Sequence, residues 1–422
     1  MKIAYLIPRC AVSGGLAVIC QHVNHLLERG HQVFLLSLEP PLLIDWFPNQ
    51  RVPVCDINDW SEPLDILVAT EWSTSFWLLR VPAKVKCYFV QSDETRFHPL
   101  DSRWRHLAAL TYYFGVNYLT EAKWIKRWLE ETFGHQVELV PNGLDPKIFH
   151  PAEPLESRGC RPRVLLEGAI NLPYKGMAEA FATVETMDVE VWCVSSYGIP
   201  KPGWRCDRFF EHVPMTEMRR IYSSCDILLK LSRVEGFFGP PMEMMACGGV
   251  SVVGKVTGYD EYIEDGVNAL VVEPEDISGA RAAVQRLIDD PGLKARLIKG
   301  GSKTVAEWDW DKSIDILDKY YLRLLSTPEC WAAHGRRAEF DRSISYAYDF
   351  MSSGVLPEDL ASKNHTLQAP HHAYVLAAYL ASNRFFWIIS GSLRTGYKLY
   401  KRLRVVWLHI LGRAKSVVRG GA

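Results

Sequence analysis

The 422-residue sequence lacks the features that mark several broad classes of protein. It has no uninterrupted apolar run of membrane-spanning length, and residues 1–7 show a strand-like run without a signal-peptide pattern. Its ten cysteines are scattered and include no CxxC pair, so neither a zinc site nor a disulfide framework is predicted and a reducing cytosol is expected. The formal net charge of -1 gives no overall attraction to nucleic acid, and no nucleic-acid partner is expected.

The sequence does contain a repeated alternation of strands and helices. A buried strand (2–7), an amphipathic helix (16–29) and a second strand (32–36) predict a β-α-β unit. Further strands are predicted at 66–69, 85–90, 137–140, 164–167, 189–194, 209–213, 227–230, 250–253 and 269–272, with helices between them such as 120–133 and 216–224. Length and order together predict an α/β fold of two Rossmann-like, doubly wound domains, each with a parallel sheet covered on both faces.

The most informative segment is RVEGFFGPPMEMMACGGVSVVGKVTGYDEYIEDGVN at 233–268. Glu235 and Glu243 stand eight positions apart, and a proline pair predicts a helix that begins at Pro240. Backbone N–H groups of Gly236, Phe237, Phe238 and Gly239 are expected to face phosphate or sugar oxygens at this helix start. Each carboxylate accepts hydrogen bonds from neighbouring sugar hydroxyls, so the pattern suits a nucleotide-sugar site. A glutamate near a helix start is otherwise an ordinary dipole or capping partner.

This segment resembles the Glu-x7-Glu signature of the retaining GT-B glycosyltransferases of family four, also called glycosyl transferases group 1. The following Gly258-Tyr259 and EDGVNALVV at 264–272 resemble the same family, and the resemblance covers roughly residues 1–325. It implies a GT-B fold with a cleft between two Rossmann-like domains. By resemblance, Glu235 binds the transferred sugar, Glu243 binds the ribose, and no metal or other cofactor is expected because the nucleotide-sugar is itself a substrate.

Two loops of the first half are predicted to face the cleft. Gly14 and Gly15 follow the first strand, and the resemblance places such a pair against the donor diphosphate and the acceptor. In YFVQSDETRF at 88–97, Gln91, Glu94 and Phe97 match a Gln-x-x-Glu-x-x-Phe pattern of a rhamnosyltransferase-like subgroup. Gln91, Asp93 and Glu94 are therefore candidates for the acceptor side, with Glu94 as a base for an acceptor hydroxyl; ordinary solvated loop charges are the alternative.

Lys175, in a Lys-Gly pair before a helix, occupies the place of the family's diphosphate-binding lysine. The predicted catalytic residues are thus Glu235, Lys175 and Glu94. The family usually has an arginine after the glycine that corresponds to Gly168, whereas this chain has Ala169. A second cation must come from elsewhere, and Arg9 and Arg233 are the candidates.

Turn-rich motifs, PNGLD at 141–145 and FHP at 149–151, resemble the interdomain link of the family. The predicted units are an acceptor-side domain (1–150), a nucleotide-sugar-binding domain (151–325), a helical extension (326–383) and a basic amphipathic tail (384–422). The tail interleaves cations with aromatic residues, which indicates binding to an anionic membrane surface through 384–419. RNA binding and packing on the protein's own core are the alternatives for this tail.

The resemblance implies a retaining hexosyl transfer from a dTDP-rhamnose, GDP-sugar or UDP-sugar donor. The expected acceptor is a hydroxyl of a surface polysaccharide, such as lipopolysaccharide, or of a lipid-linked glycan, and the expected location is the cytoplasmic, inner face of the cell membrane. Two other functions stay open: a sugar-nucleotide epimerase with a similar cleft, and a non-catalytic membrane scaffold that has kept the GT-B fold.

Overall fold

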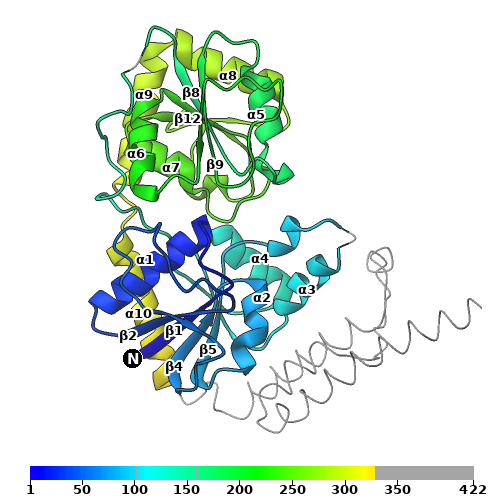
Figure 1. Cartoon of the computed structure of the whole chain (residues 1–422), viewed down its shortest axis with the longest axis vertical. Helices are drawn as coiled ribbons and strands as arrows, with labels where there is room; N and C mark the ends of the chain where they lie inside the picture. The colour runs from blue at the N-terminus through cyan, green and yellow to red at the C-terminus, as the bar shows by residue number, and fades with distance from the viewer. Residues whose placement is uncertain (101, 158, 328–422) are drawn as a thin grey trace, which may run out of the picture.

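The computed structural model describes residues 1–100, 102–157 and 159–327. All but the first two residues of the predicted helical extension, and the whole basic tail, lie outside the described residues. Figure 1 shows two α/β domains stacked along the long axis of the molecule, with the amino-terminal domain in blue and cyan and the second domain in green. Among the described residues, no helix is long and apolar enough to cross a membrane.

The first domain is built on a seven-stranded sheet in which every pairing is parallel. Its strands are β1 (Lys2–Ile7), β2 (Gln32–Ser37), β3 (Val54–Asp56), β4 (Leu64–Ala69), β5 (Ala83–Val90), β6 (Asn117–Thr120) and β7 (Val137–Leu139). The order β3-β2-β1-β4-β5-β6-β7 reverses direction between β1 and β4. Open α/β sheets bind ligands at the carboxyl edge beside such a reversal.

Helices cover both faces of this sheet because its strands are apolar on both sides. One face packs against α1 (Gly14–Glu28) and α10 (Trp310–Ser326), and the other packs against α3 (Arg103–Thr111) and α4 (Lys123–Phe133). Helix α10 is the last described element, yet it returns to the first domain, as its yellow ribbon shows (Figure 1). The Tyr5 and Tyr321 hydroxyls lie 2.7 Å apart in the core and join β1 to α10. Three shorter elements follow strands β4 and β5: α2 (Trp72–Ser75), η1 (Phe76–Leu79) and η2 (Glu94–Phe97).

The second domain has a six-stranded, all-parallel sheet in the order β10-β9-β8-β11-β12-β13. Its strands are β8 (Arg163–Glu167), β9 (Glu190–Ser195), β10 (Arg208–Glu211), β11 (Ile227–Lys230), β12 (Val250–Gly254) and β13 (Leu270–Val272). The order reverses between β8 and β11. The loops after these two strands carry Lys175 and Glu235, so the strongest sequence motif lies at the reversal.

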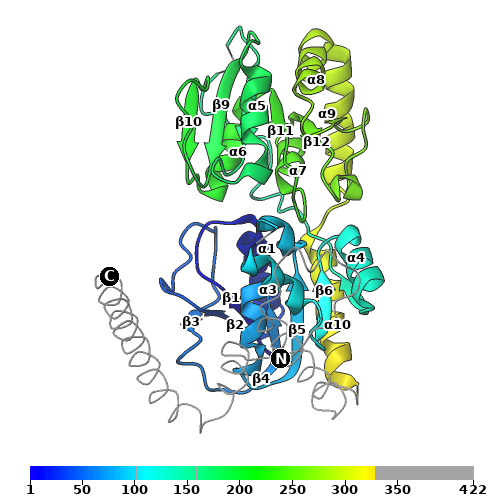
Figure 2. The same ribbon diagram turned by 90° about the vertical axis from the view of Figure 1, so that its right-hand side faces the viewer.

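The helices of the second domain lie on both faces of its sheet, as Figure 2 shows. On one face lie α5 (Met177–Val184), α8 (Ile277–Asp289) and α9 (Pro291–Val305), and on the other lie α6 (Met215–Ser224) and α7 (Gly239–Ala246). Two short turns, η3 (Pro173–Lys175) and η4 (Tyr259–Glu261), connect strands to helices at the carboxyl edge.

The predicted fold class, two Rossmann-like domains, is confirmed, and the predicted strands and helices occur within a few residues of their expected bounds. Two strands were missed. β3 has three residues and follows a proline, and β6 merges in sequence with the apolar pattern of α4, so that Thr120 ends a strand and does not begin the helix. Helix α7 begins at Gly239, one residue before the predicted Pro240.

Candidate active site

The carboxyl edges of the two sheets face each other and are in contact. The Trp124 indole of α4 donates to the Gly236 carbonyl at 2.9 Å, and the Arg96 guanidinium donates to Thr257 Oγ1 at 2.9 Å. A Cβ added to Gly236 would lie 1.8 Å from the Gln91 carbonyl oxygen, so only glycine permits this approach. The loops after β5, β6 and β11 therefore meet between the domains.

Glu235 and Lys175 form the centre of the second domain's edge. Lys175 Nζ lies 2.8 Å from Glu235 Oε2, which joins the loop after β8 to the loop after β11. Lys230 Nζ, at the end of β11, lies 3.7 Å from Glu235 Oε1. Sequence reasoning placed Glu235 and Lys175 at one site, and the structure brings them into direct contact.

The lysines keep Glu235 charged in a buried place. Glu235 is 9% exposed, and burial alone would raise the pKa of its carboxyl group. The charges of Lys175 and Lys230 outweigh burial and lower this pKa below its usual value. The site therefore presents a carboxylate and two ammonium groups in a largely dry environment, where charge interactions are strong.

Glu243 lies on α7 in the same site but has a different environment. Its Oε2 accepts a hydrogen bond from the Tyr222 hydroxyl at 2.8 Å. Burial raises the pKa of Glu243 to about 7, because the Tyr222 hydrogen bond compensates only in part. Glu243 consequently exchanges its proton near neutral pH and can both donate and accept hydrogen bonds there.

The loop between the two glutamates differs from its predicted role. The Phe237 N–H donates to the buried Glu121 carboxylate, and the Gly239 N–H donates to the Phe237 carbonyl at 3.1 Å, so these two amides already have partners. Phe238 is 1% exposed and lies in the core, while Phe237 packs against Tyr262 and Trp308. The prediction that all four residues present amides to a ligand is therefore wrong for Phe237 and Gly239.

Arg233 lies near the site but supports it from outside. Its Nη1 lies 2.8 Å from Glu179 Oε1, its Nη2 donates to the Pro173 carbonyl, and its backbone N–H donates to the Tyr174 carbonyl at 2.7 Å. These bonds hold the turn that carries Lys175. They also direct the guanidinium to the turn and to Glu179 instead of to Glu235, so Arg233 is placed as a brace for Lys175.

The glycine pair of the first domain lies at the carboxyl edge as predicted. A Cβ on Gly15 would approach Gln91 Oε1 to 3.2 Å, whereas Gly14 has open space. Gln91 Nε2 donates to the Thr70 carbonyl at 3.1 Å. The loops after β1, β4 and β5 thus converge beside the β1/β4 reversal, and Gln91 is the side chain that links them.

Glu94 and Asp93 do not occupy the expected acceptor-facing position. Glu94 is 5% exposed, and its Oε2 accepts from the Tyr88 hydroxyl at 2.8 Å and from the Trp72 N–H at 2.7 Å. Burial raises the pKa of Glu94 well above its usual value. Asp93 caps η2 by accepting from the Thr95 N–H. Both acids therefore hold local structure here, and the general-base role of Glu94 stays a prediction.

Three residues of the cleft were missed by sequence reasoning. Lys230 ends an apolar strand and is 2% exposed. Glu121, after β6, accepts from Asn142 Nδ2 at 2.9 Å, and burial raises its pKa to about 8. Glu71, after β4, also has a pKa raised by burial. Their positions in the sequence could have identified them as cleft residues, because each follows or ends a strand at the carboxyl edge.

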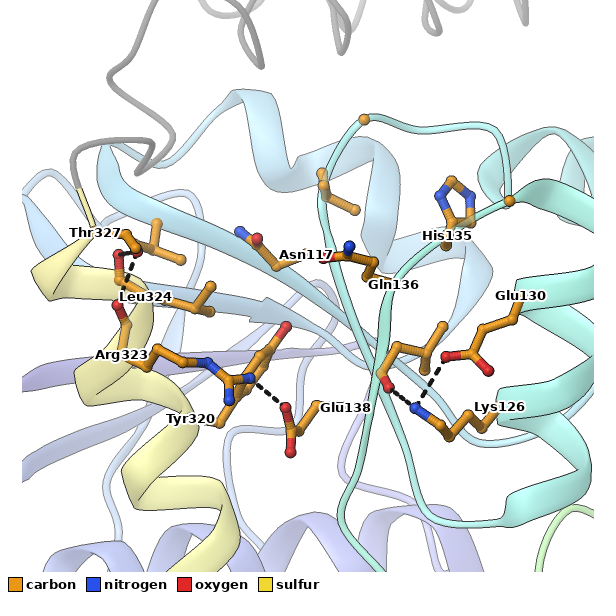
Figure 3. Close-up of a pocket in the computed structure, with 15 residues that line it drawn as sticks. Asn117, Lys126, Glu130, His135, Gln136, Glu138, Tyr320, Arg323, Leu324 and Thr327 are labelled. Carbon is orange, nitrogen blue, oxygen red and sulfur yellow. Dashed lines mark hydrogen bonds and ion pairs between the residues drawn. The ribbon is translucent and has the colours of Figure 1, made fainter.

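A cavity of about 550 Å³ lies elsewhere in the first domain (Figure 3). Its strand residues include Val85, Asn117 and Val137, which come from the amino-terminal parts of β5, β6 and β7, at the sheet edge opposite the cleft. The cations that line it have partners within it: Lys126 pairs with Glu130 at 2.9 Å, and Arg323 pairs with Glu138. This cavity is separate from the Glu235 site.

Comparisons with known proteins agree with this arrangement. Residues 208–304 match the family model described as Glycosyl transferases group 1. The O-antigen biosynthesis protein RfbC of Myxococcus xanthus is 24% identical over 278 residues, which cover 63% of this chain and 21% of RfbC. The chain spans between 21% and 58% of the length of the first three curated relatives that it matches.

Solved structures share the fold at low sequence identity. Sucrose-phosphate synthase from Thermosynechococcus elongatus superposes with a TM-score of 0.64 at 16% identity, covering 77% of this chain and 100% of that one. HepE from Anabaena, solved in complex with UDP-glucose, superposes with a TM-score of 0.61 at 14% identity, covering 76% of this chain and 99% of HepE. The predicted resemblance is confirmed: the second domain carries the sequence signature of glycosyl transferases group 1, and the chain has the GT-B fold.

Proposed function

We propose that this protein is a glycosyltransferase that moves a sugar from a nucleotide-sugar to a hydroxyl group of a glycan, with retention of the anomeric configuration. The observation that carries the proposal is the contact between Lys175 and Glu235 at the β8/β11 reversal, 2.8 Å apart and opposite the loops of the first domain. A cation and a carboxylate at such a reversal match the two ends of a sugar diphosphate.

Each charged group of the second domain has a defined task in this proposal. Lys175 leaves Glu235 and neutralises the donor diphosphate, and Glu235 then accepts hydrogen bonds from hydroxyls of the transferred sugar. Glu243, whose pKa is about 7, binds the ribose hydroxyls. The nucleotide-sugar thereby lies along the carboxyl edge from the Glu235 loop to α7.

The transfer step requires no nucleophile from the protein. The acceptor oxygen forms a bond to the anomeric carbon as the bond from that carbon to the diphosphate oxygen breaks, and the departing diphosphate takes the acceptor proton. Lys175 stabilises the negative charge that grows on the diphosphate, a contribution typical of preorganised electrostatic catalysis. Front-face attack of this kind retains the configuration of the donor.

The acceptor is proposed to be a surface polysaccharide or a lipid-linked glycan. The relatives support this class, since one is an O-antigen biosynthesis protein and another is a phosphatidyl-myo-inositol mannosyltransferase from Mycolicibacterium smegmatis. Location on the inner face of the cell membrane is part of the same proposal and rests on the basic sequence at 384–419, outside the described residues.

A thermal-shift screen against dTDP-, UDP- and GDP-sugars tests the donor site. A ligand at about a hundred times its dissociation constant stabilises the folded state by about 2.7 kcal/mol. We expect a shift with one nucleotide class, a smaller shift in Glu243→Gln, and an unchanged shift in Glu264→Gln, a control at an exposed position. The anomeric proton of the product, followed by NMR with the donor so identified, then tests retention.

Other outcomes identify the alternatives. Conversion of the nucleotide-sugar into an epimer without an acceptor contradicts the transferase and indicates an epimerase. Donor binding without transfer to polysaccharide or lipid-linked acceptors indicates a scaffold that has kept the fold. No shift with any nucleotide contradicts the donor site itself.

A further inference from the structure

We propose that Lys230 is the second cation of the donor diphosphate site. This inference rests on the proposed function and names a residue that the sequence motifs do not contain. Lys230 is the last residue of β11, next to β8 at the strand-order reversal, so its side chain starts at the carboxyl edge where Lys175 also lies.

The position of the ammonium group is the first argument. Lys230 Nζ lies 2.5 Å from Glu167 Oε2, at the end of β8, and 3.7 Å from Glu235 Oε1. Its charge also lowers the pKa of both Glu235 and Glu243 in opposition to burial. Lys230 therefore lies beside the carboxylate proposed to bind the sugar, and its charge also acts on the one proposed to bind the ribose. In a nucleotide-sugar, the group between the sugar and the ribose is the diphosphate.

The hydrogen bonds of Lys230 are the second argument. An ammonium group has three donors. One goes to Glu167 Oε2 and one to the Glu167 carbonyl at 3.1 Å. The distance of 3.7 Å to Glu235 Oε1 exceeds that of a hydrogen bond, so the third donor faces Glu235 without bonding to it. A phosphate oxygen beside Glu235 would complete this set.

The shortage of other cations is the third argument. Position 169 holds alanine, and Arg233 is bonded to Glu179 and the turn before Lys175. Lys230 is 2% exposed, and of the two carboxylates near it only Glu167 is within hydrogen-bond distance, while Glu235 is 3.7 Å away and pairs with Lys175. A ligand with two negative charges gives this buried lysine a further partner besides Glu167 and the more distant Glu235.

The test compares a nucleoside diphosphate with its monophosphate, by calorimetry, on the full chain. The probes are UDP and UMP, GDP and GMP, or dTDP and dTMP, whichever base wild-type protein binds. We expect Lys230→Met to weaken diphosphate binding at least thirtyfold and monophosphate binding less than threefold. Lys230→Arg, which keeps the charge, should preserve the wild-type ratio of the two affinities. Lys255→Met, at a lysine whose side chain is 55% exposed, is the matched control.

A purely structural Lys230 gives a different result. If it only ties β8 to β11, Lys230→Met weakens diphosphate and monophosphate binding by the same factor, and this outcome overturns the inference. Lys230→Met leaves the Glu167 carboxylate without its partner, so the double variant Glu167→Gln/Lys230→Met is measured in parallel. If the folded double variant keeps the wild-type ratio of diphosphate to monophosphate affinity, the inference is also overturned. If wild-type protein binds none of these nucleotides, the proposed function is overturned as well. If wild-type protein transfers sugar but the Lys230→Met variants keep the wild-type ratio of diphosphate to monophosphate affinity, only the role of Lys230 is overturned.

Discussion

The two facing sheet edges have the same architecture but differ in the charges around their buried carboxyl groups. At the edge of the first domain, Glu71, Glu94 and Glu121 follow strands, and burial raises the pKa of each. At the edge of the second domain, Lys175 and Lys230 lower the pKa of the buried Glu235, although burial raises that of Glu243 on α7. Both edges lie beside a reversal in strand order, so the fold alone does not distinguish them.

The difference shows what the fold supplies and what the side chains supply. A doubly wound sheet gives each domain a carboxyl edge beside a reversal in strand order, where ligands bind. Two lysines turn one of these edges into a place for a charged ligand. The other edge has carboxyl groups that accept hydrogen bonds from residues of the same domain, and Glu121 also contacts the Gly236 loop. Fold and ligand chemistry are therefore set by different residues.

The strongest test removes Lys175, the cation proposed to bind the donor diphosphate. Lys175→Met should lower kcat/KM for sugar transfer by about a hundredfold to a thousandfold, because charge stabilisation of the leaving diphosphate is lost. Steady-state kinetics with the donor identified above measure the effect. Lys255→Met is the control, and a loss below threefold in Lys175→Met would show that the second edge does not carry the transfer.

A smaller effect is expected where the edges touch. Gly236→Ala places a methyl group 1.8 Å from the Gln91 carbonyl oxygen, so the domains cannot approach as they do in the wild type. A displacement of about 1 Å between reacting groups costs about a hundredfold in rate. We expect a loss of that size in kcat with little change in thermal stability. Gly159→Ala, which meets no atom within 4 Å, is the control, and equal activity of both variants would contradict the closed arrangement.

The raised pKa of Glu121 at the first edge makes a prediction about pH. The pKa of Glu121 is raised to about 8 in the folded state, above its usual value of 4.5, so the folded state holds the proton more tightly. This contribution to stability is fully present below pH 4.5 and is lost as the pH rises through 8, at about 1.4 kcal/mol per pH unit.

Chemical denaturation at pH 6.5 and 7.5 measures this contribution. The free energy of unfolding of wild-type protein should fall by about 1.4 kcal/mol more than that of Glu121→Gln over this interval. Glu131→Gln, at an exposed position of α4, should follow the wild type. Identical slopes for wild type and Glu121→Gln would mean that Glu121 is ionised in the folded protein.

The smallest effect concerns an aromatic contact between the domains. Phe97 stacks on Tyr174 with ring centroids 5.3 Å apart, next to Lys175. Aromatic pairs of this kind contribute about 1 kcal/mol, so Phe97→Ala should raise the KM for the donor about fivefold with kcat unchanged. Leu100→Ala, at a side chain that is 75% exposed, serves as the control. A fall in kcat instead would place Phe97 in the chemical step.

The sequence predicted those features that depend on local patterns. Alternating strands and helices predicted both Rossmann-like domains, and the spacing of Glu235 and Glu243 with Lys175 before a helix located the second edge. β6 escaped because its four residues continue into α4, where the apolar pattern does not show the change from strand to helix. Short elements of this kind depend on their neighbours in the sheet.

The remaining features depend on contacts between distant residues. Glu94 was predicted to face a ligand, but Tyr88, Trp72 and Tyr112 surround it from other elements, and no local pattern shows such burial. Lys230 has the sequence signature of an ordinary strand end, and its proposed role rests on contacts with Glu167 and Glu235 that no local pattern shows. Residue type and position predict a candidate, and the tertiary environment decides its charge.

The central claim is that the charged edge of the second domain, and not the edge of the first, holds the donor diphosphate. Calorimetric titration of the nucleoside diphosphate into Lys175→Met and Arg9→Met tests it with one cation removed from each edge. We expect Lys175→Met to bind the nucleoside diphosphate at least thirtyfold more weakly than wild-type protein, and Arg9→Met to change this affinity less than twofold. Weaker binding in Arg9→Met with an unchanged affinity in Lys175→Met would contradict it.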